Sequence, residues 1–359
     1  MIKDHIDGIK DHIDDILKCT RCGRCRASCP VNEELGWEST NARGRMLLAR
    51  ALAEDVPPSE AMKTSFYTCL TCGMCSSTCP SGAKPDEVVE AARQEMVGAG
   101  AIPAYYDIVA GSIEKYGNPL GDAGSRTAWT PPSSTGKSDL IYFAGCLMSY
   151  RKQAEARAAF SLLRRFGAKL LDDEQCCGSP LLRLGGQPST IEHNRRQIER
   201  SGAKTIVTSC AGCFKTLKGD YCLEGVEVLH ITQFLARKID HLGLKRLPLK
   251  LTYHDPCHLG RCMNVYDEPR ALIRQIGSFT EMASSKQDAR CCGGGGGVRR
   301  GYKDLAQKIA TKRLSQVPPG TDYVVTACPM CNSNLEDAGG KVIDICDLIL
   351  MATGEVNSK

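Results

Sequence analysis

Residues 251–257 read Leu-Thr-Tyr-His-Asp-Pro-Cys, a short strand-like run that ends on a cysteine. Residues 140–146, Leu-Ile-Tyr-Phe-Ala-Gly-Cys, repeat this stretch 111 positions earlier (251 − 140). Two further pairs of segments match in the same order: 205–210 with 323–328, and 228–235 with 342–349. An internal repeat of this length predicts two copies of one structural unit.

Each copy alternates short β-branched runs with helical sequence, such as 153–166 in the first and 303–314 in the second. This alternation is typical of parallel α/β units. Four cysteines lie just after strand-like runs: Cys146, Cys210, Cys257 and Cys328. A strand-like segment at 169–172 and a weaker one near 281–283 precede the Cys-Cys-Gly elements. Because ligands gather beyond the carboxyl ends of parallel strands, we expect the cysteines of each unit to converge on one rim.

The two units carry the same five-cysteine pattern. The first set is Cys146, Cys176, Cys177, Cys210 and Cys213, and the second is Cys257, Cys291, Cys292, Cys328 and Cys331. Thiolate is a soft ligand that selects iron–sulfur clusters, zinc or Cu(I) over hard cations. A cubane [4Fe–4S] cluster takes four cysteines, so a fifth indicates either a spare thiol or a different kind of cluster.

Two further cysteine runs lie upstream, each spaced C-x2-C-x2-C-x3-C and followed by proline. They are Cys19, Cys22, Cys25 and Cys29, then Cys69, Cys72, Cys75 and Cys79. This is the bacterial ferredoxin spacing, in which the fourth cysteine ligates the other cluster. We therefore predict two cubane [4Fe–4S] clusters with exchanged fourth ligands, so that Cys79 joins the first run and Cys29 the second. Zinc fits poorly because zinc sites rarely use four cysteines in so tight a run.

Composition narrows the class of protein. The 46 Lys and Arg against 41 Asp and Glu leave a net charge of +5, too weak a bias to predict nucleic-acid binding, and only 6% of residues are aromatic. A long chain with 21 cysteines, many in C-x-x-C pairs, indicates metal or redox chemistry in a reducing compartment. We find neither a signal peptide nor a stretch of about 20 apolar residues. We expect a cytoplasmic protein that reaches a membrane only through a partner.

The chain divides at changes in composition. Isoleucines at helical spacing predict an amphipathic N-terminal helix, and Gly, Pro and Ser enrichment predicts a linker before the repeat. The predicted parts are an amphipathic helix over 1–18, a helical di-cluster domain over 19–116, a linker over 117–138, and two α/β units over 139–248 and 249–359. The expected fold class is α+β multidomain, with a helical ferredoxin-like domain before two pseudo-symmetric α/β domains.

Both five-cysteine sets resemble the CCG domain of the B-type subunit of heterodisulfide reductase and of its fused relative, the D-type subunit. In the second set 33 residues precede Cys291 and 34 separate Gly293 from Cys328, and in the first set the corresponding numbers are 29 and 31. The N-terminal runs resemble the C-type subunit of the same enzyme. The likeness therefore covers residues 19 to 351, in the order of a fusion of the C-type and B-type subunits.

The resemblance implies that each complete set holds a noncubane [4Fe–4S] cluster on its five cysteines. Two such clusters facing one cavity suit the two-electron reduction, or formation, of a thiol disulfide, with the cubane clusters relaying single electrons. The ten CCG cysteines are the implied catalytic residues, and His258, which follows Cys257, is predicted to act with them. The implied partners are a flavoprotein or a membrane cytochrome b and quinone module, and the implied substrate is a small anionic thiol or disulfide.

Two alternatives stay open. Iron–sulfur subunits that carry electrons from a glycolate, lactate or glycerol-3-phosphate dehydrogenase toward quinone share this architecture and have no substrate of their own. A third interpretation places zinc in one CCG set.

Several polar residues lie close to the cysteines. His254 and His258 flank Cys257, where a protonated imidazole can protonate a leaving thiolate or tune a cluster. Basic residues that follow cluster cysteines are candidate ligands for an anionic substrate. They are Lys152, Arg183, Arg261, Arg299 and Arg300. The glycines of 293–301 predict close approach of the backbone to a cluster or substrate rather than a dinucleotide site, because no clear strand leads into them.

Overall fold

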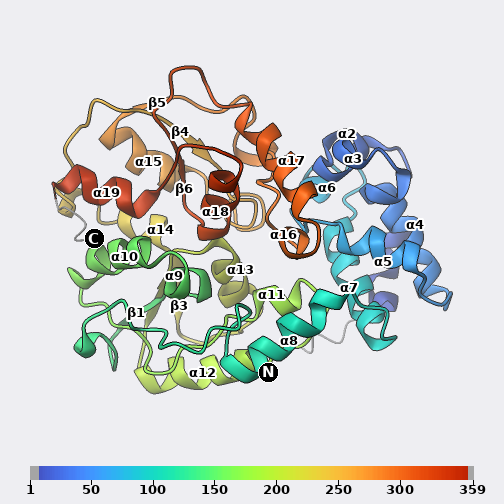
Figure 1. Cartoon of the computed structure of the whole chain (residues 1–359), viewed down its shortest axis with the longest axis horizontal. Helices are drawn as coiled ribbons and strands as arrows, with labels where there is room; N and C mark the ends of the chain where they lie inside the picture. The colour runs from blue at the N-terminus through green and yellow to red at the C-terminus, as the bar shows by residue number, and fades with distance from the viewer. Residues whose placement is uncertain (1–7, 355–359) are drawn as a thin grey trace.

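The computed structural model describes residues 8–354, and Figure 1 shows a helical N-terminal part beside two mixed α/β units. The expected mixture of helices and parallel strands is confirmed. Residues 1–7 of the helix predicted over 1–18 lie outside the described residues. The rest of that segment forms the 3-10 helix η1 (Ile9–His12) and helix α1 (Ile13–Leu17). Ile9 and Ile16 are buried, so this segment packs on its own helical part.

The N-terminal part is helical throughout its regular structure. Its further helices are α2 (Arg24–Ser28), α3 (Pro30–Leu35), η2 (Glu38–Thr40), α4 (Ala42–Ala53), α5 (Glu60–Tyr67), α6 (Met74–Ser77), α7 (Pro85–Gly98) and α8 (Ala104–Tyr116). Local sequence sets several starts. Pro30 and Pro85 occupy first turns, where a missing N–H costs nothing. The Asn41 side chain caps α4 by accepting a hydrogen bond from the Gly44 amide at 3.3 Å.

The first α/β unit contains a parallel sheet in the order β1-β2-β3. Its elements are β1 (Leu140–Phe143), α9 (Cys146–Tyr150), α10 (Gln153–Arg164), α11 (Ser179–Leu182), α12 (Thr190–Ser201), β2 (Thr205–Thr208), α13 (Ala211–Gly219), β3 (Glu227–His230), α14 (Ile231–Ala236) and η4 (Ile239–His241). The segment 169–172 makes only isolated bridges to Thr135 and Ile141. It is therefore not the full strand that the sequence predicts, because its pairing ends after two residues.

The second unit contains a parallel sheet in the order β5-β4-β6-β7. Its elements are β4 (Lys250–His254), α15 (Asp267–Ile276), β5 (Ser278–Phe279), η5 (Lys286–Asp288), α16 (Val298–Gly301), α17 (Lys303–Leu314), β6 (Tyr323–Thr326), α18 (Pro329–Asp337), β7 (Val342–Asp344) and α19 (Ile345–Thr353). The edge strand β5 lies just before the expected segment 281–283. In both units the cysteine elements follow the carboxyl ends of the strands.

The two units share one apolar core, in which α10 packs against α19 and α14 against α15. The segment 117–138 lies on the first unit, where the Trp129 ring meets Phe160 edge-on at 6.0 Å. Arg93 of α7 joins the helical part to both units. Its buried guanidinium donates to the carbonyls of Cys69 at 2.7 Å and Gly296 at 3.0 Å, and also to that of Arg183. Among residues 8–354, no helix is long and apolar enough to cross a membrane.

A candidate iron–sulfur site built on four cysteine sets

One cavity of about 500 Å³ lies where the carboxyl ends of the two sheets face each other. All ten CCG cysteines line it: Cys146, Cys176, Cys177, Cys210, Cys213, Cys257, Cys291, Cys292, Cys328 and Cys331. Eight of them are buried, and Cys210 and Cys257 are half-buried. The two sets that the repeat places 111 residues apart are therefore neighbours in space.

The thiols of each set lie close together, and the two sets meet at one pair. The thiol of Cys210 contacts that of Cys328, and this contact lowers the pKa of Cys328 well below its usual range. Contact with the Cys176 thiol similarly lowers the pKa of Cys177. Every cysteine in the chain is a free thiol. So dense a group of buried sulfurs without disulfides matches the soft donor set that an iron–sulfur cluster requires.

The glycine of each Cys-Cys-Gly element has a steric role. Gly178 and Gly293 both have φ of +90°, which favours glycine. A Cβ atom on Gly293 would lie 2.5 Å from the carbonyl oxygen of Ala306. The Gly178 amide lies 3.5 Å from the Cys176 sulfur, and the Gly293 amide lies 3.4 Å from that of Cys291. The turn thus aims a backbone donor at the first cysteine of each pair.

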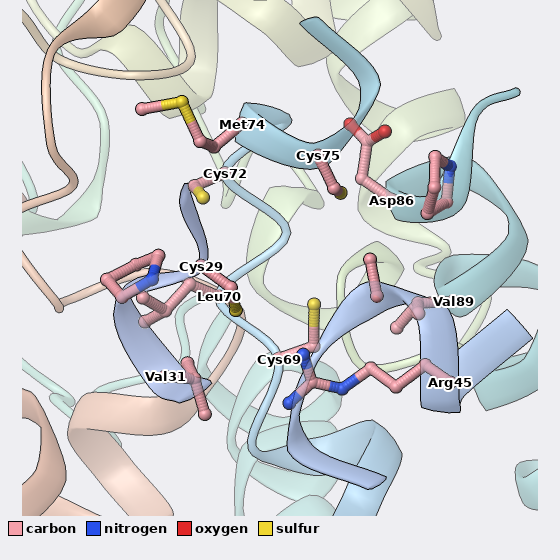
Figure 2. Close-up of a pocket in the computed structure, with 13 residues that line it drawn as sticks. Cys29, Val31, Arg45, Cys69, Leu70, Cys72, Met74, Cys75, Asp86 and Val89 are labelled. Atoms are coloured by element: carbon pink, nitrogen blue, oxygen red, sulfur yellow. The ribbon is translucent and has the colours of Figure 1, made fainter. Parts of the chain in front are cut away.

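The N-terminal runs exchange their fourth cysteines in space. Cys29 lines one pocket together with Cys69, Cys72 and Cys75, and Figure 2 shows these four side chains around a common space. A second pocket is lined by Cys19, Cys22, Cys25 and Cys79, and Cys75 lines this pocket as well. Each pocket therefore brings together the four cysteines that the ferredoxin spacing predicts for one cubane cluster.

The pocket of Cys29 adjoins the second CCG set rather than the first. The Cys72 thiol contacts the Cys291 thiol, and this contact lowers the pKa of Cys72. Arg261 spans the junction by donating to the carbonyls of Cys72, at 3.3 Å, and Ala289. Arg261 is not one of the described residues that line the large cavity. The structure thus favours a role in holding this junction over the predicted role in substrate binding.

Arg126, from the segment 117–138, was not singled out by the sequence. Its Nη2 lies 3.4 Å from the Cys146 sulfur, and its Nη1 pairs with the Glu174 carboxylate at 3.1 Å. Glu174 also accepts hydrogen bonds from the amides of Ala144 and Gly145, at 2.8 and 2.9 Å. This buried pair holds a positive charge against the first CCG set. The only sequence signal was an arginine in a stretch rich in Gly, Pro and Ser.

His258 lines the cavity but is neutral near pH 7. Burial, with Lys215 and Arg183 nearby, lowers its pKa to about 3. Its Nε2 lies 3.3 Å from the carbonyl oxygen of Thr71, to which it donates. The predicted action as a protonated acid is therefore not supported by its surroundings. A structural hydrogen bond between the second unit and the helical part accounts for this residue.

The basic candidates fall into two groups. Arg183 lines the cavity but is buried in ion pairs with Glu90 and with Asp220, the latter at 3.0 Å. Lys152 pairs with Glu155 and with Glu336, at 3.2 and 2.5 Å, and is not among the described lining residues. The second group lines the cavity near its exposed side: Arg299, which pairs with Asp337 at 2.6 Å, and Arg300 and Lys303. Lys303 was missed because it opens α17, beyond the glycine-rich segment that drew the prediction.

Comparison with known proteins agrees with this division of the chain. The cysteine-rich domain family CCG matches residues 140–218 and 251–336, and the 4Fe-4S dicluster domain family matches residues 15–83. The D-type subunit of the dihydromethanophenazine:CoB–CoM heterodisulfide reductase of Methanosarcina barkeri is 35% identical, over 94% of this chain and 93% of its own.

More distant relatives carry other names. The B-type subunit of the fumarate reductase (CoM/CoB) of Methanothermobacter marburgensis is 34% identical over 93% of this chain and 72% of its own. The EtfAB:quinone oxidoreductase of Syntrophomonas wolfei is 27% identical over 96% of this chain and 59% of its own. Among solved structures, the aspartate racemase of Picrophilus torridus aligns with a TM-score of 0.29 at 12% identity, covering 60% of this chain and 95% of its own, a likeness too weak to inform the fold.

Proposed function

The chain belongs to the family of D-type heterodisulfide reductase subunits, and we propose that it is the catalytic iron–sulfur subunit of an oxidoreductase that reduces, or in reverse forms, a thiol disulfide. The family predicted from the cysteine sets is confirmed. The reaction consumes two electrons and two protons for each disulfide, RSSR′ + 2 e⁻ + 2 H⁺ → RSH + R′SH. Bound clusters would supply the electrons.

The single observation that carries the proposal is the shared cavity of about 500 Å³. A protein that only relays electrons needs a row of neighbouring cluster sites. It needs no cavity for a second reactant. Here ten cysteines from two units line one cavity, so that clusters bound to the two sets would face each other across it. Two sets facing the same cavity suit a substrate with two sulfur atoms, since both sulfurs then lie near an electron source.

The ligand sets follow from the cysteines that the structure brings together. We propose one cubane cluster on Cys19, Cys22, Cys25 and Cys79, a second on Cys29, Cys69, Cys72 and Cys75, and a noncubane cluster on each five-cysteine CCG set. The contact of Cys72 with Cys291 supports entry of electrons at the second CCG set. The contact of Cys210 with Cys328 then links the second set to the first.

The lining of the cavity supports a substrate that is partly apolar and carries an anionic group. Tyr105, Leu147 and Met148 are among its apolar lining residues. Arg300 and Lys303 line the same cavity, are exposed, and have no ion-pair partner among residues 8–354. Unpaired cations beside an apolar surface suit a thiol with a carboxylate, sulfonate or phosphate group.

The second candidate is an electron-transfer subunit between a flavoprotein and quinone. The relative named EtfAB:quinone oxidoreductase favours it, although its identity of 27% is lower than the 35% of the Methanosarcina barkeri heterodisulfide reductase relative. Under either function we propose that a partner subunit, a flavoprotein or a membrane cytochrome, exchanges electrons with the N-terminal clusters.

Iron and sulfide quantification combined with EPR during thiol titration tests the proposal. We expect about sixteen irons per chain after anaerobic purification, and a new EPR signal when candidate anionic thiols are added to the oxidised protein. Absence of any thiol-dependent signal, together with full reduction through a flavoprotein, would instead establish electron transfer. About twelve irons with stoichiometric zinc would place zinc in one CCG set.

A further inference from the structure

The two CCG units differ at the last residue of their first repeated strand. Phe143 ends β1 in the first unit, and His254 ends β4 at the matching place of the second. Both side chains are fully buried. A buried imidazole needs a partner for each ring nitrogen, whereas a phenyl ring needs none. The difference therefore introduces two polar atoms beside the second set only.

Arg313 of α17 decides which nitrogen of His254 carries the proton. Its Nε donates to His254 Nδ1 at 3.0 Å. The guanidinium is itself held by the carbonyl of Ser284 at 2.9 Å and by the side chain of Gln316 at 2.6 Å. A guanidinium has no acceptor, so Nδ1 must accept and cannot hold a proton. The ring is then neutral, with its hydrogen on Nε2.

The imidazole ring of His254 lies beside the second CCG set. Within residues 8–354, Nε2 has no hydrogen-bond partner. The ring offers a nitrogen within 4.8 Å of the sulfurs of both Cys292 and Cys331, which are themselves within that distance of each other. A buried N–H donor next to two thiolates is a favourable arrangement, because the thiolates gain a hydrogen bond and the donor gains an acceptor.

We propose that His254 is a positioning residue that directs its Nε2–H at the sulfurs of Cys292 and Cys331, and so raises the reduction potential of the second CCG site above the value it would have without this donor. The inference rests on the proposed function, because it requires a cluster on each set. Hydrogen bonds to cluster sulfurs stabilise the more negative, reduced state and so raise the potential. Phe143 provides no such donor in the first unit.

A role for His254 as a metal ligand is disfavoured by the same contacts. A ligand nitrogen needs a free lone pair. The lone pair of Nδ1 is engaged by Arg313, and Nε2 carries the proton. Direct coordination would need the loss of the Arg313 hydrogen bond, which is enclosed in the core.

The test compares two nearly isosteric substitutions in the full chain, purified anaerobically with its clusters. His254→Met removes the donor, and His254→Gln keeps an N–H near the position of Nε2. Midpoint potentials are titrated by EPR and visible absorption, and iron is counted. We expect His254→Met to shift one noncubane potential to a more negative value with iron unchanged, and His254→Gln to restore most of that shift. The matched control, Phe143→Met, should shift neither potential.

Three results would overturn the inference. They are equal potentials in His254→Met and the wild type, equal shifts in the Met and Gln variants, and the loss of about four irons in His254→Met, which would make His254 a ligand. Wild-type protein without noncubane signals would overturn the proposed function and this inference together. Wild-type signals that ignore His254→Met would overturn the inference alone.

Discussion

The two CCG units carry the same five cysteines but surround them with different groups. The first set faces the Arg126–Glu174 pair, which contacts the Cys146 thiol. The second set contacts Cys72 of the helical part, and its cysteines lie beside His254. Repetition of a motif thus provides two equal donor sets, and the chain then gives each set its own electrostatic environment and its own neighbours.

Under the proposed function this difference matters, because a disulfide takes up two electrons and iron–sulfur clusters deliver them one at a time. Two identical sites have no preferred order of reduction. Unequal surroundings separate the two potentials, since charge and hydrogen bonds near a cluster set its potential. The second set adjoins the pocket of Cys29 and meets the first at Cys328. The comparison therefore predicts that the second unit receives electrons and the first unit receives them from it.

The largest expected effect is the loss of either CCG set. Cys292→Ser and its counterpart Cys177→Ser should each lower the rate of disulfide reduction by about a thousandfold or more. The reason is that each of the two substrate sulfurs needs a cluster beside it. Each should lose up to about four of sixteen irons, and the N-terminal clusters should stay reducible in both. Turnover with reduced viologen measures the activity of each variant, and iron analysis measures its iron content. Activity that survives Cys177→Ser alone would confine the chemistry to the second unit.

The next prediction concerns the junction between the helical part and the second unit. Cys29→Ser should damage the cubane site formed with Cys69, Cys72 and Cys75, and so slow electron delivery to both CCG sets. Cys79→Ser, the matched control, should instead damage the cubane site formed with Cys19, Cys22 and Cys25. EPR of the reduced variants distinguishes the two sites. Damage by Cys29→Ser to the site of Cys19, Cys22 and Cys25 would contradict the exchanged assignment.

Buried arginines offer a comparison of stability. Arg270→Met in the second unit leaves Asp255 without its buried partner at 2.7 Å and should cost about 3–5 kcal/mol of unfolding free energy. Arg126→Met in the first unit should be destabilising too, because it leaves Glu174 buried. Since Arg126 alone of the two contacts a cysteine thiol, its variant should also lose iron from the first set. Urea unfolding measures the stability of both variants, and iron analysis measures how much iron each variant keeps. Equal iron loss in the two variants would contradict a specific role of Arg126 at the first set.

A smaller effect is expected at the cationic side of the cavity. Arg300→Gln and Lys303→Gln should each raise KM for an anionic disulfide about tenfold, with kcat nearly unchanged, because each removes a charge-assisted contact made to the bound substrate. Lys152→Gln is the control, since Lys152 is paired with Glu336 and does not line the cavity. Steady-state kinetics at several salt concentrations measure this. An equal change in the control would indicate a general charge effect.

The smallest expected effect is a change in unfolding free energy at a helix cap. His230 caps α14 in the first unit, and Asp344 caps α19 in the second. Burial lowers the pKa of His230 to about 4 from 6.5, so its stabilising contribution is complete above pH 6.5 and is lost as the pH falls toward 4. The loss that His230 alone contributes at pH 5.5, relative to pH 7.5, should therefore be roughly 1 kcal/mol. His230→Asn, which cannot titrate, should lose less over the same interval in anaerobic urea unfolding.

Cysteine spacing predicted which thiols lie together, and local composition predicted most of the helices and strands. The helices expected over 153–166 and 303–314 are α10 and α17, because helix-forming composition acts within a few positions. The strands before Cys146 and Cys257 were predicted from their strand-like runs, which are also local features of the sequence. The expected strands at 169–172 and 281–283 were wrong or displaced, since strand formation depends on a neighbouring strand that local sequence does not specify.

The groups that surround those thiols depend on contacts between residues far apart in the sequence. Arg93 reaches Gly296 across 203 positions, and Arg183, which lines the cavity, pairs with Glu90 across 93. Arg126 comes from a segment whose composition predicts only a linker, yet it contacts Cys146. Such contacts leave no periodic or local pattern, because a buried charge is satisfied by whatever partner the fold brings near it. Cysteine spacing therefore reveals what the chain binds, and packing decides how differently its two CCG sets behave.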